Sequence, residues 1–368
     1  MKSILILLFA FIGINAVAQQ NSFKPGLIWP DNNGVHINAH GGGILDFKGT
    51  YYWFGEHKIE GRRGNSTLVG VHCYSSKDLY NWKDEGIALR ITDDTTSLLQ
   101  KGCVIERPKV IYNQKTKKFV MWFHHELKGK GYSAAMTGVA VSDNVTGPYT
   151  WMKSFNPNAG IWPSNYTAEQ KAMKFTEKLK DWSEEWKVAV KQGMFIQRDF
   201  AKGQMARDMT LYIDEDGKAY HIHASEENLT LHISELNADY TDFSGKYVTV
   251  APAGHNEAPT LFKKDGKYYM ITSGCTGWAP NAARLLVSDS VMGEWTYLGN
   301  PCHGEKSEIT YNSQSTYILP VPGKKGEFIF MADRWVPENA IDGRYVWLPI
   351  QFDPKGIPFL EWKDEWKY

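Results

Sequence analysis

The chain has 368 residues, with 41 Lys and Arg balanced by 41 Asp and Glu, so its formal net charge is zero. This balance gives no reason to expect nucleic acid or an anionic membrane surface as a partner. Aromatic residues form 14% of the chain, including 14 tryptophans, which is typical of β-sheet cores with a few rings left to stack on sugars.

A cleavable signal peptide is predicted over residues 1–18. Lys2 precedes an apolar run from Ile4 to Ile14, and Ala16-Val17-Ala18 provides the small residues of a cleavage site. The apolar run is too short to favour a membrane span, and no cysteine follows the site, so we expect no membrane anchor. The expected product is an exported protein, periplasmic or extracellular, with a single domain over residues 19–368.

Five segments of the chain share one pattern, in which a polar residue precedes a strand, a turn and a second strand. In four of them the polar residue lies nine positions before a turn glycine: His40 with Gly49, Asp208 with Gly217, Glu257 with Gly266, and Gln314 with Gly323. The fifth segment starts at Glu106 and turns through residues 113–117 instead. Hairpins repeated about every fifty residues indicate radial repetition of one sheet. The sequence therefore predicts an all-β fold, a five-bladed β-propeller.

The repeats divide the chain into units at about 40–95, 103–155, 205–250, 255–300 and 312–362. Residues 165–193 interrupt this series with apolar residues at three- and four-residue steps, which is the period of a helix. Thr167 and Gln170 form a capping box, and Gly193 suits the position just past a helix end. We expect one amphipathic helix inserted between blades two and three, which either packs on the propeller side or acts as a lid over the pit.

The chain has four cysteines, Cys73, Cys103, Cys275 and Cys302. In an exported protein these could form disulfide bonds. Their spacing matches no zinc-binding pattern. Two local pairs, 73–103 and 275–302, and four free buried thiols are both compatible with the sequence.

The five polar residues define the candidate site, because equivalent positions of propeller blades converge on the axis. Two or three carboxylates in one pit are typical of glycoside hydrolase active sites. In these, one carboxyl protonates the departing oxygen and another group activates water. Glu257 is the candidate general acid. The neighbouring charge of Asp208 would raise the pKa of Glu257 and orient it.

The base is left open by the sequence. Glu106 is the natural base by charge, but the adjoining Arg107 could pair with it and make it a sugar-binding residue. Gln314 holds the fifth register position as a neutral amide, which can position a water. His40 precedes three glycines that permit close approach, either to a sugar or to the hub of the propeller.

Together these motifs resemble glycoside hydrolase family 43, and most closely its exo-β-1,3-galactanase branch. The resemblance rests on Glu-Arg-Pro-Lys-Val at 106–110, Glu-Ala-Pro at 257–259, Ser-Gly-Cys-Thr-Gly-Trp-Ala-Pro-Asn at 273–281, His-Gly-Gly-Gly-Ile-Leu at 40–45 and Tyr-Tyr-Trp-Phe-Gly-Glu at 51–56. It covers nearly the whole mature chain apart from the insertion. It implies a five-bladed propeller and an inverting mechanism, with Glu257 as acid and Asp208 as its modulator.

The chain departs from the wider family in its first blade, where most members carry an aspartate base and this chain has His40 and Gly41. The galactanase branch also lacks that aspartate, and residues matching Gln314 and Glu106 are its two competing candidates. By the same matching, the resemblance implies sugar contacts at Glu56, Tyr132, Asn228, Thr276 and Trp278.

The expected function is an exported, inverting exo-hydrolase that releases terminal galactose from the β-1,3-galactan of arabinogalactan. The alternatives are an α-L-arabinofuranosidase, a β-xylosidase or a galactofuranosidase on the same scaffold, or a non-catalytic sugar-binding propeller. We expect no cofactor, since Gly41-Gly42-Gly43 lacks the lysine or helix of a phosphate-binding loop. A structural calcium is compatible with such a propeller, but no run of ligands indicates one.

Overall fold

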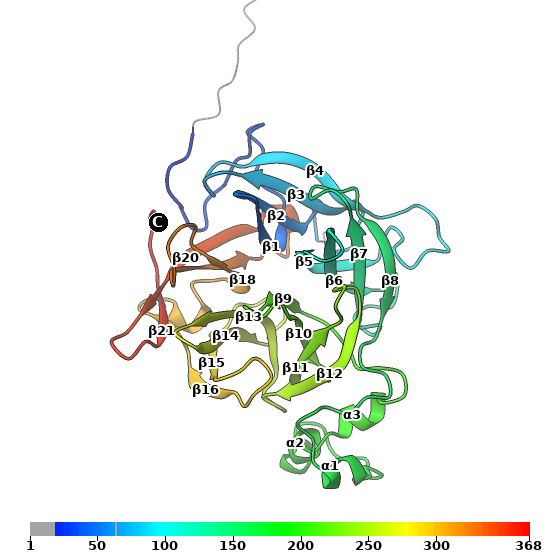
Figure 1. Ribbon diagram of the computed structural model, residues 1–368. Helices are drawn as coiled ribbons and strands as arrows, with labels where there is room; N and C mark the ends of the chain where they lie inside the picture. The colour runs from blue at the N-terminus through cyan, green and yellow to red at the C-terminus, as the bar shows by residue number, and fades with distance from the viewer. Residues whose placement is uncertain (1–18, 63–64) are drawn as a thin grey trace, which may run out of the picture.

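Five antiparallel sheets surround a common axis in the computed structural model, which describes residues 19–62 and 65–368 (Figure 1). The five-bladed propeller expected from the repeats is therefore confirmed. The segment 1–18, for which we expect a signal peptide, lies outside the described residues. Within the described ranges, we find no helix whose length and apolar character would let it cross a membrane.

Each blade is a meander whose first strand lies nearest the axis and contacts the first strands of its neighbours. Blade 1 is β1 (His40–Phe47), β2 (Thr50–Glu56), β3 (Gly70–Ser76) and β4 (Lys83–Arg90), and blade 2 is β5 (Val104–Asn113), β6 (Lys118–Glu126), β7 (Met136–Ser142) and β8 (Thr150–Phe155). Blade 3 is β9 (Met209–Ile213), β10 (Ala219–Ser225), β11 (Thr230–Leu236) and β12 (Phe243–Val250), and blade 4 is β13 (Asn256–Lys264), β14 (Lys267–Gly274), β15 (Arg284–Ser288) and β16 (Thr296–Gly299). Blade 5 is β18 (Gln314–Pro320), β19 (Phe328–Arg334), β20 (Arg344–Phe352) and β21 (Pro358–Glu361), with β17 (Cys302–His303) parallel to β21 at its edge.

One backbone irregularity recurs at the start of the innermost strands. The register shifts between His40 and Gly43 in β1, between Glu106 and Lys109 in β5, and between Glu257 and Thr260 in β13. In each case the residue after the polar one has a positive φ: 59° at Gly41, 55° at Arg107 and 51° at Ala258. A bulge re-aims the side chains beside it. Three of the five register positions of the sequence thus correspond to a bulge at the hub.

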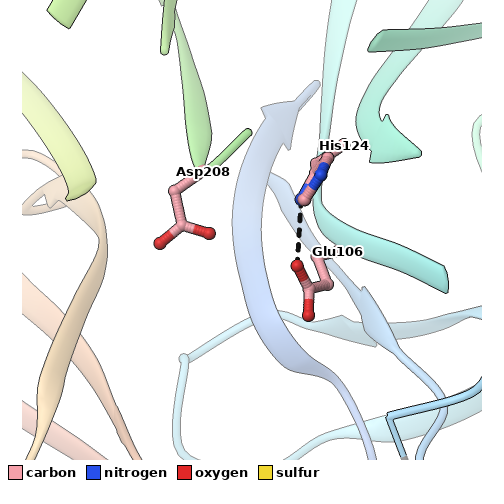
Figure 2. Close-up of side chains that lie close together, drawn as sticks. All are labelled: Glu106, His124 and Asp208. Carbon is pink, nitrogen blue, oxygen red and sulfur yellow. Dashed lines mark hydrogen bonds and ion pairs between the residues drawn. The ribbon is translucent and has the colours of Figure 1, made fainter. Parts of the chain in front are cut away.

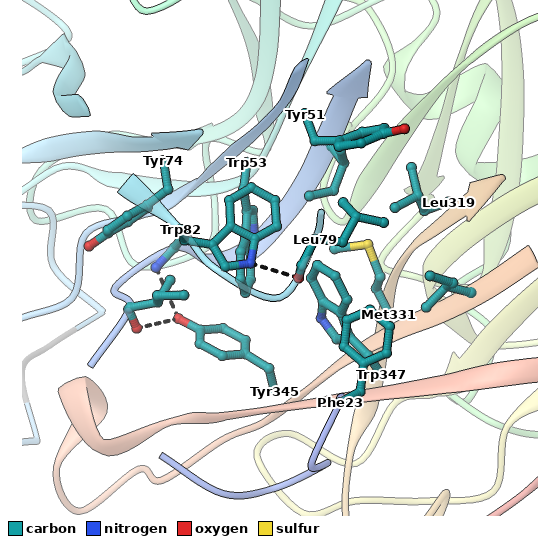
Figure 3. Close-up of a cluster of buried hydrophobic side chains, with 14 of the residues drawn as sticks. Phe23, Tyr51, Trp53, Tyr74, Leu79, Trp82, Leu319, Met331, Tyr345 and Trp347 are labelled. Atoms are coloured by element: carbon teal, nitrogen blue, oxygen red, sulfur yellow. Dashed lines mark hydrogen bonds between the residues drawn. The ribbon is translucent and has the colours of Figure 1, made fainter. Parts of the chain in front are cut away.

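An aromatic cluster closes the ring between blade 1 and blade 5 (Figure 3). Phe23 and Trp29 of the N-terminal segment pack with Trp53 and Trp82 of blade 1 and with Trp347 of β20. The backbone of Phe23 also pairs with that of Trp366 near the C-terminus. Burying each of these rings contributes about 2–3 kcal/mol, so the seam between first and last blade is held mainly by apolar contact.

The insertion differs from the single helix that we expected. Residues 165–193 form two short helices, α1 (Ala168–Ala172) and α2 (Glu184–Lys191), and a third, α3 (Met194–Asp199), follows directly. The capping box at Thr167 starts α1, but the backbone turns extended at Met173 and Ser183 caps a second helix. Gly193 ends α2 in a left-handed conformation, as predicted. The prediction of one continuous helix is wrong, because its apolar periodicity spans two separately capped helices.

All four cysteines lie in the described ranges, and each is a free thiol. Cys73, Cys103 and Cys302 are buried, and Cys275 is half-buried. Of the two interpretations that the sequence left open, the structure therefore has the one without disulfide bonds.

Candidate active site

A pit of about 240 Å³ opens at the axis, and all but two of the predicted site residues line it. Its lining consists of Glu56, Lys58, Asn65, Glu106, Arg107, His124, Tyr132, Arg207, Asp208, Asn228, Glu257, Gly277, Trp278, Gln314 and Trp335. The volume is below the roughly 300–1,000 Å³ of pockets that enclose drug-sized ligands. A pit of this size suits one end of a chain rather than its middle. No described residue of the segment 165–193 lines it, so the insertion is not a lid.

Glu257 and Asp208 share this pit, as their register predicted. The Ala258 N–H, which follows Glu257, donates to Asp208 Oδ2 at 3.1 Å. Burial raises the pKa of Glu257 to about 7, the charge of Asp208 adds to this rise, and the Arg107 guanidinium opposes it. Glu257 therefore holds a proton over a pH range in which an ordinary glutamate is ionised.

Gln314 uses every hydrogen-bonding position of its amide. Its Oε1 accepts from Arg107 Nη2 at 2.6 Å and from Trp335 Nε1 at 3.0 Å. Its Nε2 donates to Glu257 Oε1 and to Ser273 Oγ, both at 2.9 Å. Two donors on one side and two acceptors on the other leave the amide only one orientation. Gln314 thereby directs an N–H at one oxygen of Glu257.

Glu106 lies in a different environment within the same pit. Its Oε1 accepts from Tyr132 Oη at 2.7 Å and from Asn65 Nδ2 at 2.8 Å. Its Oε2 lies 2.9 Å from His124 Nδ1 (Figure 2). The other ring nitrogen of His124, Nε2, lies 2.9 Å from Glu126 Oε1. A histidine with a carboxylate on each nitrogen donates from both as an imidazolium.

The protonation states of Glu106 and His124 follow from the contacts between them and Glu126. Burial alone would lower the pKa of His124, but the hydrogen bonds and charges of Glu106 and Glu126 raise it to about 9. Burial alone would raise the pKa of Glu106, but His124 holds it well below its ordinary value, with help from Lys58 and Tyr132. Glu106 is therefore an anion over the whole pH range in which Glu257 gains or loses its proton.

The sequence left open whether Arg107 pairs with the adjoining Glu106. In the structure Arg107 does not pair with Glu106 but reaches across the axis, where Nη2 lies 2.8 Å from Asp208 Oδ2. Its Nη1 donates to the Ser315 carbonyl at 2.9 Å. The bulge explains this placement, because Arg107 has a left-handed backbone and its side chain leaves the strand on another side from that of Glu106.

Two of the predicted sugar-binding residues lie outside the pit lining. His40 is fully buried at the hub, with its ring stacked on Tyr345 at 5.3 Å, which agrees with the packing alternative for this residue. The hydroxyl of Thr276 donates to the Ala279 carbonyl at 2.6 Å and accepts from Asn281 Nδ2 at 2.7 Å. Thr276 thus shapes the loop that carries Trp278, and its own side chain bonds within that loop.

Several residues that line the pit were not predicted from the sequence: Lys58, Asn65, His124, Arg207, Gly277 and Trp335. The position of His124 could have been predicted from the pairing of the two strands in its hairpin. An antiparallel hairpin places the end of its second strand opposite the start of its first, and the register pairs Glu106 with His124 and Glu257 with Ser273. Lys58 and Asn65 lie in the loop beyond β2, where no periodic pattern indicates position.

Glu106, His124 and Asp208 lie close enough to share a cation, since their ligand atoms are within 4.8 Å of one another. The donors nevertheless fit a cation poorly. Both nitrogens of His124 already face carboxylates, and Asp208 is paired with the Arg107 guanidinium. We assign no metal to these residues.

Known proteins are similar to this chain in sequence and in fold. Residues 173–330 match the family described as glycosyl hydrolases family 43. A family-43 β-1,3-galactosidase solved with galactodeoxynojirimycin is 55% identical, with 94% of this chain and 100% of that chain covered and a TM-score of 0.92. A variant of the exo-β-1,3-galactanase of Phanerochaete chrysosporium, solved with β-1,3-galactotriose, is 31% identical, covering 95% of this chain and 68% of that chain with a TM-score of 0.76.

A curated relative of different specificity also matches. The xylan 1,3-β-xylosidase of a Vibrio species is 22% identical over 324 residues, which are 81% of this chain. The matched part is 51% of that protein, so the chain spans about half the length of this relative.

The pairing of Asp208 with Glu257 can be tested without any substrate. Replacing Asp208 by Asn removes the neighbouring negative charge, so the pKa of Glu257 should fall from about 7 toward the ordinary value of about 4.3. Carbon-13 NMR titration of the glutamate carboxyls measures this shift, with the Glu257→Gln protein used to assign the resonance. Asp239→Asn, at an exposed position of blade 3, serves as the control. An unchanged pKa in Asp208→Asn would refute the coupling.

Proposed function

The chain belongs to glycoside hydrolase family 43, and we propose that within it this protein is an exported, exo-acting enzyme that releases terminal galactose from β-1,3-galactan with inversion. One observation carries the proposal: a pit for one chain end contains a carboxyl of pKa about 7 beside a carboxylate that stays ionised. The similar solved proteins are a β-1,3-galactosidase and an exo-β-1,3-galactanase, which supports a β-1,3-linked galactosyl substrate. The signal peptide expected over residues 1–18 supports export.

Glu257 is the general acid in this proposal. A carboxyl with a pKa of about 7 is protonated in a large fraction of molecules at neutral pH and can give its proton to the departing glycosidic oxygen. Gln314 Nε2 donates to Oε1 of Glu257 at 2.9 Å, whereas Asn228 Nδ2 donates to Oε2 over a longer 3.3 Å. The weaker contact makes Oε2 the better position for the proton. Asp208 raises the pKa of Glu257 without donating a proton itself.

Glu106 and Gln314 are the two candidates for the general base, and each has a different obstacle to accepting a proton. Glu106 carries the negative charge that a base needs, but the low pKa imposed by His124 makes it a weaker proton acceptor. Gln314 is a neutral amide whose nitrogen lone pair is delocalised, so only its oxygen could accept a proton, and that oxygen must first lose the hydrogen bond from Arg107 or Trp335. A protonated amide is cationic, and the neighbouring Arg107 guanidinium opposes that charge. Substitution of each group separates the two.

The substrate is tested by incubating the protein with β-1,3-galactobiose, with an aryl α-L-arabinofuranoside and a xylobioside as controls. We expect galactose from the first and none from the controls. Proton NMR of the earliest product should show α-galactose, since inversion changes the β anomer to α. Release of arabinose or xylose without galactose would assign the protein to another specificity within the family.

The acid is tested by Glu257→Gln. Because a glycosidic oxygen needs the proton, turnover of β-1,3-galactobiose should fall by about 10²–10⁴-fold. An aryl β-galactoside with a good leaving group should lose far less. In the unaltered enzyme, kcat on the disaccharide should decline as pH rises above about 7, since Glu257 then loses its proton. Equal losses on both substrates would remove Glu257 from this role.

The base is tested by comparing Glu106→Ala with Gln314→Ala. Loss of the true base should slow the disaccharide and the aryl galactoside alike, and azide should restore turnover by attacking in place of the activated water. Loss of the other group should leave a variant that azide does not rescue. Gln314→Glu is the matched variant, because it keeps the shape of the side chain and supplies an acceptor. Azide rescue of both Ala variants would contradict a single-base mechanism.

A further inference from the structure

Trp182 has an unusual combination of backbone strain and exposure. It lies between α1 and α2 with a φ of 67°, in the left-handed region that bulky residues rarely adopt. Its side chain is 54% exposed. A strained conformation of this kind costs about 1–3 kcal/mol and persists only where the surrounding structure holds it. A single exposed indole is common on protein surfaces. An exposed indole on a strained backbone is less common, and it indicates a role for the side chain.

The position of Trp182 relates it to the pit. Its ring lies 4.9 Å from the ring of His255 in an edge-to-face arrangement, and 5.3 Å from Trp186. His255 is two residues before Glu257 in the chain, in the loop that enters β13. The exposed indole therefore stands beside the loop that delivers the candidate acid to the pit.

The insertion holds this indole on a rigid support. Ser183, the next residue, caps α2 by accepting from the Trp186 N–H. Trp186 is buried in a cluster with Val190, Phe195 and Leu229. Leu229 follows Asn228 in the β10–β11 turn, and Asn228 contacts Glu257 at 3.3 Å. The helices thus pack on the loops behind the pit, and Trp182 is carried by that packed core.

From this placement we propose that Trp182, with His255, forms a subsite outside the pit that stacks on a galactosyl residue in the leaving part of the substrate. The inference rests on the proposed function. The pit accommodates only one chain end, so the rest of a galactan chain lies across the rim. A flat indole covers the apolar face of a pyranose, as aromatic side chains cover other flat apolar surfaces. The insertion thereby extends substrate binding without lining the pit.

Trp182→Gly is the variant that tests this subsite. Glycine adopts a positive φ without steric cost, so this substitution removes the indole and relieves the backbone. We expect KM for β-1,3-galactotetraose to rise roughly 3–10-fold, the size of effect typical of one aromatic contact. The kcat and KM for β-1,3-galactobiose should not change, since the disaccharide fills the pit and its mouth only. Val188→Ala, at an exposed apolar position within α2, is the control and should match the unaltered enzyme on both substrates.

A binding measurement separates this proposal from the proposed function. Calorimetric titration of Glu257→Gln, with and without Trp182→Gly, measures affinity for the disaccharide and the tetrasaccharide independently of turnover. Weaker binding of the tetrasaccharide alone supports the subsite. Equal affinity of the two proteins for the tetrasaccharide, equal weakening for both lengths, or no binding by either protein overturns it. Failure of the proposed function would instead appear as no galactose released from β-1,3-galactobiose by the unaltered protein.

Discussion

The site depends on one buried cation. Arg107 comes from blade 2 and joins Asp208 before blade 3 to Gln314 and Ser315 of blade 5. Burying a guanidinium is costly unless ion pairs and hydrogen bonds replace its water, and here three groups from other blades provide them. Because Arg107 fixes the oxygen of Gln314, it also fixes the N–H that Gln314 directs at Glu257. Arg107 thus joins three blades at the hub and, through Gln314, orients the candidate acid.

The same pit keeps two glutamates in opposite protonation states. Glu257 is half-buried, and this partial burial together with the negative charge of Asp208 raises its pKa to about 7. Glu106 is buried, but the imidazolium of His124 and the hydroxyl of Tyr132 stabilise its charged form. Environments that separate the pKa values of two carboxyls are the usual basis for assigning acid and base roles in glycoside hydrolysis. Here the separation arises from which charge lies next to each carboxyl.

The helical insertion contacts two of the loops next to the site. Its helices lie at the periphery of the propeller (Figure 1), yet Trp186 packs on Leu229 and Trp182 contacts His255. Leu229 and His255 lie one and two residues from Asn228 and Glu257 along the chain. A segment outside the repeat pattern thus packs, through Trp186, on the turn that carries Asn228, while Trp182 contacts the loop before Glu257.

The sequence by itself determined the five blades and the five polar residues at the starts of their hairpins. Hairpin turns and strand periodicity are local properties, so each repeat carries the pattern in its own sequence. Four of those residues, Glu106, Asp208, Glu257 and Gln314, do line one pit. Only the tertiary structure decided which groups pair. Arg107 bonds to Asp208, 101 positions away, rather than to its neighbour, and His124 enters from a second strand. The physical reason is closure of the ring: it brings distant side chains into contact at bulges whose direction no local pattern encodes.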